Sequence, residues 1–164
     1  MGKVILVCGK MGSGKTTYAR GLANEINAVV IEHDEIMLGL FGGELYANDK
    51  ELFFKYHVWV DEYTKRMAKE AAKAGATVIF ANGFWSRAER DELRNVYAKM
   101  GIPCELHYID TYEEQRRKNI QKRNEEIQQG KPGYILNNKK DVNHFFEVPE
   151  NAEITRIVTL EKII

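Results

Sequence analysis

The feature that most constrains this chain is a glycine-rich turn between a short apolar segment and a helix-forming one. The apolar run from Val4 to Cys8 has the length of a buried strand, and residues 15–26 have helical character. The turn between them matches the pattern G-x-x-x-x-G-K-[ST] in full and is written Gly9-Lys10-Met11-Gly12-Ser13-Gly14-Lys15-Thr16. Glycines let successive backbone N–H groups turn inward toward phosphate oxygens, and the N-terminus of the following helix adds partial positive charge. The sequence therefore predicts a nucleoside triphosphate site.

The side chains of this turn are expected to divide the work of binding the nucleotide. Lys15 should reach the β- and γ-phosphates, and the Thr16 hydroxyl should ligate Mg²⁺. The residues expected to bind ATP are Gly9, Lys10, Met11, Gly12, Ser13, Gly14, Lys15, Thr16 and Thr17.

A second nucleotide motif points to guanine instead of adenine. Residues 138–141, Asn-Lys-Lys-Asp, match the N-K-x-D signature by which GTPases read guanine. Those proteins also need a D-x-x-G after the third strand, and here the corresponding stretch, residues 80–85, contains no aspartate. We therefore disfavour a GTPase switch.

Along the rest of the chain, strand-like and helix-like segments alternate. Strands are expected at 4–8, 28–31, 77–81, 104–109 and 154–160, and the longer helices at 15–26, 48–74, 86–100 and 111–129. Such alternation implies right-handed crossovers and a mainly parallel sheet that is covered on both faces. The chain length of 164 residues fits one domain, residues 1–164.

The helix expected at 48–74 carries a regular apolar pattern. Three- and four-residue spacings join Leu52, Tyr56, Trp59, Tyr63, Met67, Ala71 and Ala74. We expect this stripe, with Tyr56 and Trp59 in it, to face the core. Asn48 with Glu51 should cap the helix, while Ser86-x-x-Glu89 and Thr111-x-x-Glu114 should open the two later ones.

Composition excludes several classes of protein. Twenty-four basic side chains balance twenty-four acidic ones, which argues against a partner held by bulk charge, such as duplex DNA or an anionic membrane. No apolar run approaches the ~20 residues that a membrane span needs. Two cysteines cannot form a disulfide scaffold, so we expect a cytoplasmic protein. No obligate protein partner is evident. The four histidines lack metal-ligand spacing and are interpreted as structural or surface residues.

A carboxylate stands where a catalytic base is needed. Asp34 follows the second predicted strand, at the carboxyl edge where open α/β sheets bind ligands. There it could accept a proton from a substrate hydroxyl that attacks the γ-phosphate. Asp34 could also cap a helix that starts at Glu35, and both roles are compatible.

Together these positions resemble the small P-loop kinases related to phage polynucleotide kinase, zeta toxins and chloramphenicol phosphotransferase. The resemblance covers most of the chain and rests on residues 9–16, Asp34, 78–90 and 116–124. It implies a three-layer α/β P-loop kinase fold with five mainly parallel strands, which we expect in the order 2-3-1-4-5. It also implies that Asp34 is the general base and that a helical lid, at about 115–140, closes over ATP. Arg123 best matches the lid arginine, with Arg116 and Arg117 as helpers.

Two departures bear on the phosphate acceptor. Polynucleotide kinases have arginine where this chain has Met37, and aspartate where it has Asn82. Loss of the arginine removes a phosphate contact, so we expect ATP-dependent transfer to the hydroxyl of a small neutral or cationic molecule. The acceptor itself is undetermined, with Asn82, Trp85 and the glycines of residues 39–43 as candidate contacts.

Two other functions stay open. A polynucleotide 5′-hydroxyl kinase, acting on a single-stranded 5′ end, is favoured by residues 116–140, which hold eight Lys or Arg and two Glu. A nucleotide-binding ATPase or GTPase switch would have no phosphate acceptor at all.

Overall fold

The structure is a computed structural model that describes residues 2–135 and 142–159, and its centre is a five-stranded sheet. The strands are β1 (Val4–Cys8), β2 (Val29–Ile31), β3 (Val78–Gly83), β4 (Cys104–Asp110) and β5 (Arg156–Thr159). They pair in the order β2-β3-β1-β4-β5, and every pairing is parallel. The predicted strand order is therefore confirmed.

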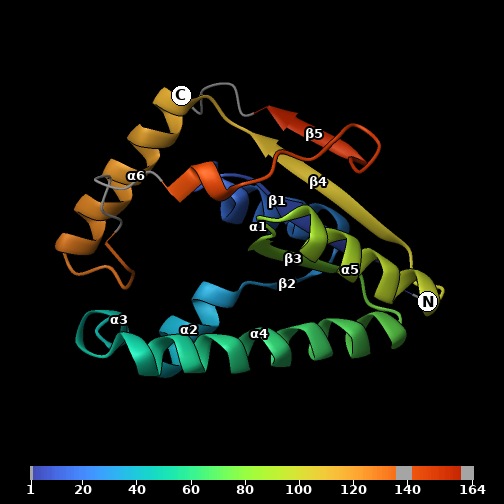
Figure 1. Cartoon of the computed structure of the whole chain (residues 1–164), viewed down its shortest axis with the longest axis horizontal. Helices are drawn as coiled ribbons and strands as arrows, with labels where there is room; N and C mark the ends of the chain where they lie inside the picture. Colours follow the sequence, from blue (N-terminus) through green and yellow to red (C-terminus); the bar gives the residue numbers. More distant parts are fainter. Residues whose placement is uncertain (1, 136–141, 160–164) are drawn as a thin grey trace.

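Helices cover both faces of this sheet (Figure 1). They are α1 (Lys15–Ile26), α2 (His33–Phe41), α3 (Leu45–Asn48), α4 (Lys50–Lys73), α5 (Arg87–Lys99) and α6 (Glu113–Gln128), with a short 3₁₀ helix at Val142–Phe145. Among the described residues, none of these helices is long and apolar enough to cross a bilayer.

The core is divided by the sheet, because β1 is buried along its whole length and packs on both sides. On one side, Ala68 and Ala72 of α4 and Tyr97 of α5 pack against the strands. On the other side, α1 contributes Ala19 and Leu22. The result is the predicted three-layer architecture, in which the carboxyl ends of β4 and β5 point toward α6 (Figure 1).

The prediction for the buried face of α4 was wrong. The residues that α4 buries are Phe53, Val60, Thr64, Ala68 and Ala72. They lie one position away from the predicted stripe, whose Trp59, Tyr63 and Met67 are exposed. Small side chains at 64, 68 and 72 let the helix approach the sheet closely, which bulky aromatic residues would prevent. Tyr56 is half-buried and stacks on Phe41, with the ring centres 4.4 Å apart.

The starts of the helices follow the sequence signals only in part. The Ser86 hydroxyl accepts from the backbone N–H of Glu89 at 3.1 Å, so that cap is confirmed. Asp49, not Asn48, caps α4 by accepting from the N–H of Leu52. Thr111 does not cap α6, because its hydroxyl donates to the carbonyl of Ser13 at 2.8 Å. This bond ties the entry to α6 to the glycine-rich turn.

The start of α2 excludes one of the two roles considered for Asp34. This helix begins at His33, with Glu32 in the cap position. Asp34 therefore lies inside the first turn and does not cap a helix that starts at Glu35. The guanine motif at 138–141 falls outside the described residues.

Candidate active site

The glycine-rich turn closes around the amine of Lys15. The Nζ atom donates to the carbonyls of Gly9 at 2.9 Å and Lys10 at 3.0 Å. Gly14, with φ of 94°, occupies the left-handed region directly before α1, which glycine adopts without strain. The exposed Thr17 lies in the first turn of α1, next to Thr16. The turn thus has the form of an anion cradle at the start of a helix.

Electrostatics make Lys15 a strong binder of negative charge. Burial lowers the pKa of Lys15 to about 8, and the nearby charge of Arg123 acts in the same direction, although Asp34 and Glu32 oppose them. An ammonium that is disfavoured in this way gains most from a ligand that supplies anionic oxygens. Phosphate groups of a nucleotide meet that need.

Thr16 lies beside a carboxylate that the sequence analysis missed. The Oγ1 atom of Thr16 donates to Oε1 of Glu32 at 2.8 Å, and Arg20 lies 3.5 Å from the same carboxyl group. In the described part of the chain, Oε2 of Glu32 is buried without a hydrogen-bond partner. Burial raises the pKa of Glu32 above its usual value, more than the bond from Thr16 and the charge of Arg20 lower it.

The oxygens of Thr16 and Glu32 fit a magnesium ion. Mg²⁺ prefers hard oxygen ligands and is commonly held by one or two protein groups together with phosphates and water. Within residues 2–135 and 142–159, no cluster of three or more His, Cys, Asp or Glu could hold a metal by itself. The sequence feature that could have identified Glu32 as a site residue is its position at the end of β2, the strand that also leads to Asp34.

Asp34 presents an ionised carboxylate to this region. Its side chain is 57% exposed, and its Oδ1 lies 3.8 Å from Nδ1 of His33. The interaction with His33 lowers the pKa of Asp34, and the positive charge of Arg123 adds to this effect, although burial opposes it. Asp34 is therefore a carboxylate near neutral pH and can accept a hydrogen bond from an alcohol.

Neighbouring residues fix the direction of Asp34. The backbone N–H of His33 donates to Oδ1 of Asn82 at 2.9 Å, which joins the end of β3 to the first turn of α2. The His33 ring, only 5% exposed, places Nε2 2.9 Å from the carbonyl of His57 in α4. Burial lowers the pKa of His33, but Asp34 and the His57 carbonyl outweigh it, so the pKa is raised overall. Asn82 and His33 thus position Asp34.

Helix α6, in the segment predicted to form a lid, contacts the glycine-rich turn directly. Arg116 is buried and places Nη1 3.4 Å from the carbonyl of Met11. Asn119 donates to the carbonyl of Gly12 at 2.8 Å. The approach is close enough that a Cβ atom on Gly12, where φ is 74°, would lie 2.7 Å from the carbonyl oxygen of Arg116. Arg117 is exposed and pairs with Glu113 one turn earlier in α6.

Arg123 and Tyr134 lie near the same charges. The guanidinium of Arg123 lowers the pKa of Lys15 and of Asp34, so it shares their electrostatic environment. Tyr134 was not predicted. It packs on Phe53 at 5.5 Å, and in the described part of the chain its buried hydroxyl has no hydrogen-bond partner. Burial raises the pKa of Tyr134, and the negative charge of Asp34 raises it further.

The candidate acceptor contacts lie in different surroundings. Met37, which stands in place of an arginine, is buried in the core and offers no surface to a ligand. The indole of Trp85 lies at the edge of the site, because Trp85 and Lys15 both approach Gly83. A Cβ atom built on Gly83 would lie 2.8 Å from Nε1 of Trp85 and 3.9 Å from Cε of Lys15. Gly39 lies within α2, so the predicted glycine loop begins only at residue 42, and it is Gly43 that approaches Gly133 in the segment after α6.

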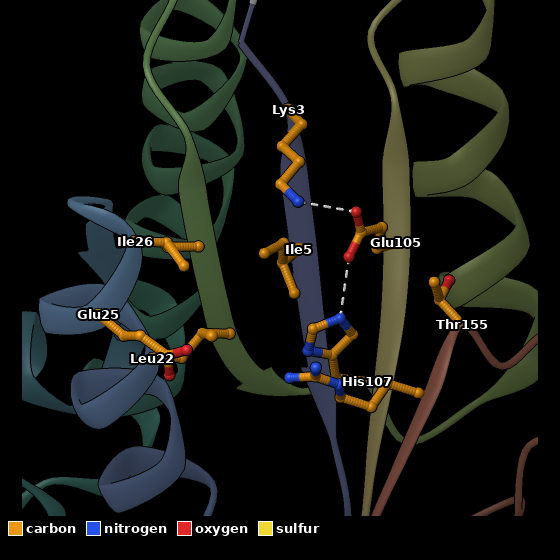
Figure 2. A pocket seen from close by; sticks show the side chains of 9 residues that line it. Lys3, Ile5, Leu22, Glu25, Ile26, Glu105, His107 and Thr155 are labelled. Carbon is orange, nitrogen blue, oxygen red and sulfur yellow. Dashed lines mark hydrogen bonds and ion pairs between the residues drawn. The ribbon is translucent and has the colours of Figure 1, made fainter.

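A second hollow lies away from these residues. It has a volume of about 330 Å³ and is lined by α1 and by the starts of β1, β4 and β5. Lys3 pairs with Glu105 at 2.8 Å, and Glu105 lies 3.0 Å from His107 (Figure 2). Because Lys3 and Thr155 precede their strands, this hollow is at the amino ends of the sheet, opposite the glycine-rich turn. Ligands of open α/β sheets bind at the carboxyl ends, so we place the candidate site at the turn.

Comparison with known proteins finds a matching family. The model of a family described as AAA domain matches residues 4–134. A search of curated proteins finds no match.

Solved kinase structures share the fold. A putative kinase from Chloroflexus aurantiacus superposes with a TM-score of 0.71 at 17% identity, over 97% of this chain and 84% of that one. The Mycobacterium tuberculosis APS kinase, in complex with AMPPNP and APS, gives 0.65 at 16% identity, over 98% and 90%. A sugar kinase from Janibacter gives 0.58 at 19% identity, over 98% and 85%.

Proposed function

This chain belongs to the AAA domain family of P-loop kinase-like proteins, and on that premise we propose that it transfers the γ-phosphate of ATP to the hydroxyl of a small molecule. The observation that carries the proposal is that two charged groups of the carboxyl edge act on each other electrostatically. Burial lowers the pKa of the Lys15 amine while the negative charge of Asp34 raises it, and His33 keeps Asp34 ionised.

In this proposal the glycine-rich turn holds the phosphates of ATP through backbone N–H groups and Lys15. Thr16 and Glu32 are the protein groups that would hold Mg²⁺. When bound, the ion would neutralise charge on the β- and γ-phosphate oxygens. Oε2 of Glu32 is available for this role, because in the described residues it has no hydrogen-bond partner and lies 3.5 Å from Arg20.

Asp34 then activates the acceptor. Its carboxylate takes the proton of the acceptor hydroxyl as the oxygen forms a bond to the γ-phosphorus, and the bond from phosphorus to the leaving oxygen of ADP breaks. Charge spreads over the transferred group in this transition state, and positive groups that are already in place lower its energy. The positive charges assigned to this task are Lys15 and Arg123, which both share the electrostatic environment of Asp34, and Arg116, which contacts the turn.

The acceptor in this proposal is small and neutral or cationic. Asp34 supplies negative charge that suits a cationic acceptor. Met37 is buried in the core at the position where polynucleotide kinases have an arginine, so the contact to an acceptor phosphate is lost. Trp85 and Tyr134 offer an indole N–H and a hydroxyl to a polar molecule. A polynucleotide is less favoured because several cations of the basic segment are paired with neighbouring acids. These pairs are Arg117–Glu113, Lys118–Glu114 and Lys131–Glu126.

The test is a screen with γ-labelled ATP against amino alcohols, sugars, nucleosides and 5′-hydroxyl oligonucleotides. We expect label in a small hydroxyl compound with the wild type and none with Lys15→Ala. Lys73→Ala is the control, since this exposed lysine pairs with Glu70 in α4 and is none of the proposed binding residues. Label found only in inorganic phosphate, whatever the acceptor, would contradict the proposal and favour a switch. Label in oligonucleotides alone would favour the polynucleotide alternative.

A further inference from the structure

The turn at the end of β3, residues 83–85, has a backbone conformation that few side chains adopt. Gly83 has a φ of 90°, and the next residue, Phe84, has a φ of 46°. In the described part of the chain, the one other residue besides glycine with a positive φ is Asn27, which caps the end of α1, where this conformation is common. A bulky aromatic residue in the left-handed region is rare, and such backbone strain is concentrated at functional sites. The surrounding structure must therefore hold this turn in place.

A buried ion pair holds the turn from behind. Arg90 of α5 is 0% exposed, and its Nη1 donates to the carbonyl of Phe84 at 3.0 Å and lies 3.4 Å from the carbonyl of Trp85. The carboxylate of Glu153, itself 6% exposed, accepts from Nε of Arg90 at 3.1 Å. The ring of Phe84 is buried edge to face with Phe80, at 5.3 Å. Because one planar guanidinium contacts the carboxylate and both carbonyls, it fixes the direction of two consecutive peptide groups.

The turn directs the half-buried indole of Trp85 toward Lys15. The indole lies so close to Gly83 that Nε1 would be 2.8 Å from a Cβ atom at this position, and Cε of Lys15 would be 3.9 Å from the same atom. On the indole's other contact, Phe146 packs edge to face at 5.9 Å. Within the part of the chain that the structure describes, no hydrogen bond uses Nε1 of Trp85. A fixed N–H donor without a protein partner thus lies beside the lysine of the glycine-rich turn.

We propose that the indole N–H of Trp85 donates a hydrogen bond to the γ-phosphoryl group of ATP, and that Arg90 is the positioning residue that keeps it there. The inference rests on the proposed function, in which Lys15 holds the β- and γ-phosphates. A phosphoryl group at the end of the Lys15 side chain lies next to the indole, and it stays next to it while it passes to the acceptor. A donor that is already oriented stabilises the charge that spreads over the phosphoryl oxygens during transfer.

Arg94 provides a matched control for Arg90. It lies one turn later in α5, and its Nη2 is 3.3 Å from the same carboxylate oxygen of Glu153. Its Nη1 lies 3.4 Å from the carbonyl of Glu153, and in the described part of the chain it has no bond to the turn at 83–85. Substitution of either arginine therefore disturbs the ion pair with Glu153. Only substitution of Arg90 also releases the turn that carries Trp85.

The first experiment follows the indole N–H of Trp85 by NMR in the full chain and needs no phosphate acceptor. The chain has two tryptophans, so Trp59→Phe leaves a single indole signal. We expect AMPPNP with Mg²⁺, which carries a γ-phosphoryl group, to move this signal downfield, and ADP with Mg²⁺ to move it little. Arg90→Lys should abolish the difference, because one ammonium cannot hold Glu153 and two carbonyls at once, whereas Arg94→Lys should retain it. Equal shifts with both nucleotides, or a full AMPPNP response in Arg90→Lys, would overturn the proposal.

The second experiment leaves the buried ion pair intact. Trp85→Phe keeps an aromatic ring against Phe146 but removes the N–H. Calorimetric titration should show AMPPNP binding weakened about tenfold and ADP binding unchanged within twofold, since a hydrogen bond to a charged group is lost only where the γ-phosphoryl group is present. Trp59→Phe, the same substitution at an exposed position of α4, should change neither. If the wild type binds both nucleotides but Trp85→Phe weakens them equally or not at all, this inference is wrong; if the wild type binds neither, the proposed function fails with it.

Discussion

The unusual state of Lys15 makes ATP binding depend on pH in a window where most lysines do not titrate. Burial holds the pKa of Lys15 at about 8, against 10.5 for an ordinary lysine. Phosphate binding needs the charged ammonium. The fraction of charged Lys15 therefore falls from about nine-tenths at pH 7 to about one-tenth at pH 9.

The magnitude follows from these fractions. If only the ammonium form binds, the affinity for ATP should fall about tenfold between pH 7 and pH 9, or about 1.4 kcal/mol. The terminal phosphate of ATP contributes little to the change because its last pKa is near 6, so it is already ionised. Lys15→Arg is the matched variant, since a guanidinium stays charged throughout this range. Its affinity, although weaker, should not vary with pH.

The ligand-free protein should respond to pH in the opposite direction. Because the pKa of Lys15 is lowered in the folded state, the unfolded chain binds more protons between about pH 8 and 10.5. The contribution of Lys15 to stability therefore increases with pH across that window, whereas ATP affinity decreases. The assay is calorimetric titration with ATP, supported by thermal unfolding without nucleotide, on the wild type and Lys15→Arg. Equal ATP affinity of the wild type at pH 7 and pH 9 would refute this reasoning.

Three further predictions concern the residues around the nucleotide. Arg123→Ala should lower the transfer rate more than it weakens ATP binding, and Arg123→Lys should restore little, because a point charge cannot bridge two phosphate oxygens. The control is Arg117→Ala, at an exposed paired position, which should change neither rate nor affinity in steady-state kinetics. Glu32→Gln should raise the Mg²⁺ concentration needed for half-maximal transfer, and an unchanged magnesium titration would exclude Glu32 from that site. Gly12→Ala should destabilise the protein by more than 1 kcal/mol, measured by urea unfolding, because the new methyl group meets the backbone of Arg116 at a positive φ.

The sequence predicted the parts of the molecule that local patterns determine. The apolar run of β1 and the glycine turn after it are adjacent along the chain, and so are the motif residues from Gly9 to Thr16. Alternating strands and helices predicted a mainly parallel sheet, whereas the strand order was predicted from the resemblance to P-loop kinases. Asp34 could be placed at the carboxyl edge because it directly follows the second predicted strand.

The remaining features depend on packing between distant segments. In α4, hydrophobic periodicity favoured the bulky stripe with Trp59 and Tyr63, whereas close packing against the sheet favoured the smaller residues Thr64 and Ala68. No local pattern decides between two apolar faces of one helix. Tyr134 enters the site because the segment after α6 packs on α4, a contact between residues 81 positions apart in sequence for the pair Tyr134 and Phe53. Such contacts appear only when the chain is folded.

The measurement that most directly tests the account is the rate of phosphoryl transfer by Asp34→Asn, with ATP affinity and melting temperature determined on the same sample. The substitution keeps the size of the side chain but removes the charge that accepts the proton. We predict a loss of transfer by about 10²–10⁴, with ATP affinity within a few-fold of the wild type. Glu35→Gln, the same change of charge one residue along α2, should retain full activity. An Asp34→Asn variant that transfers phosphate at the wild-type rate would contradict the central claim that Asp34 is the catalytic base.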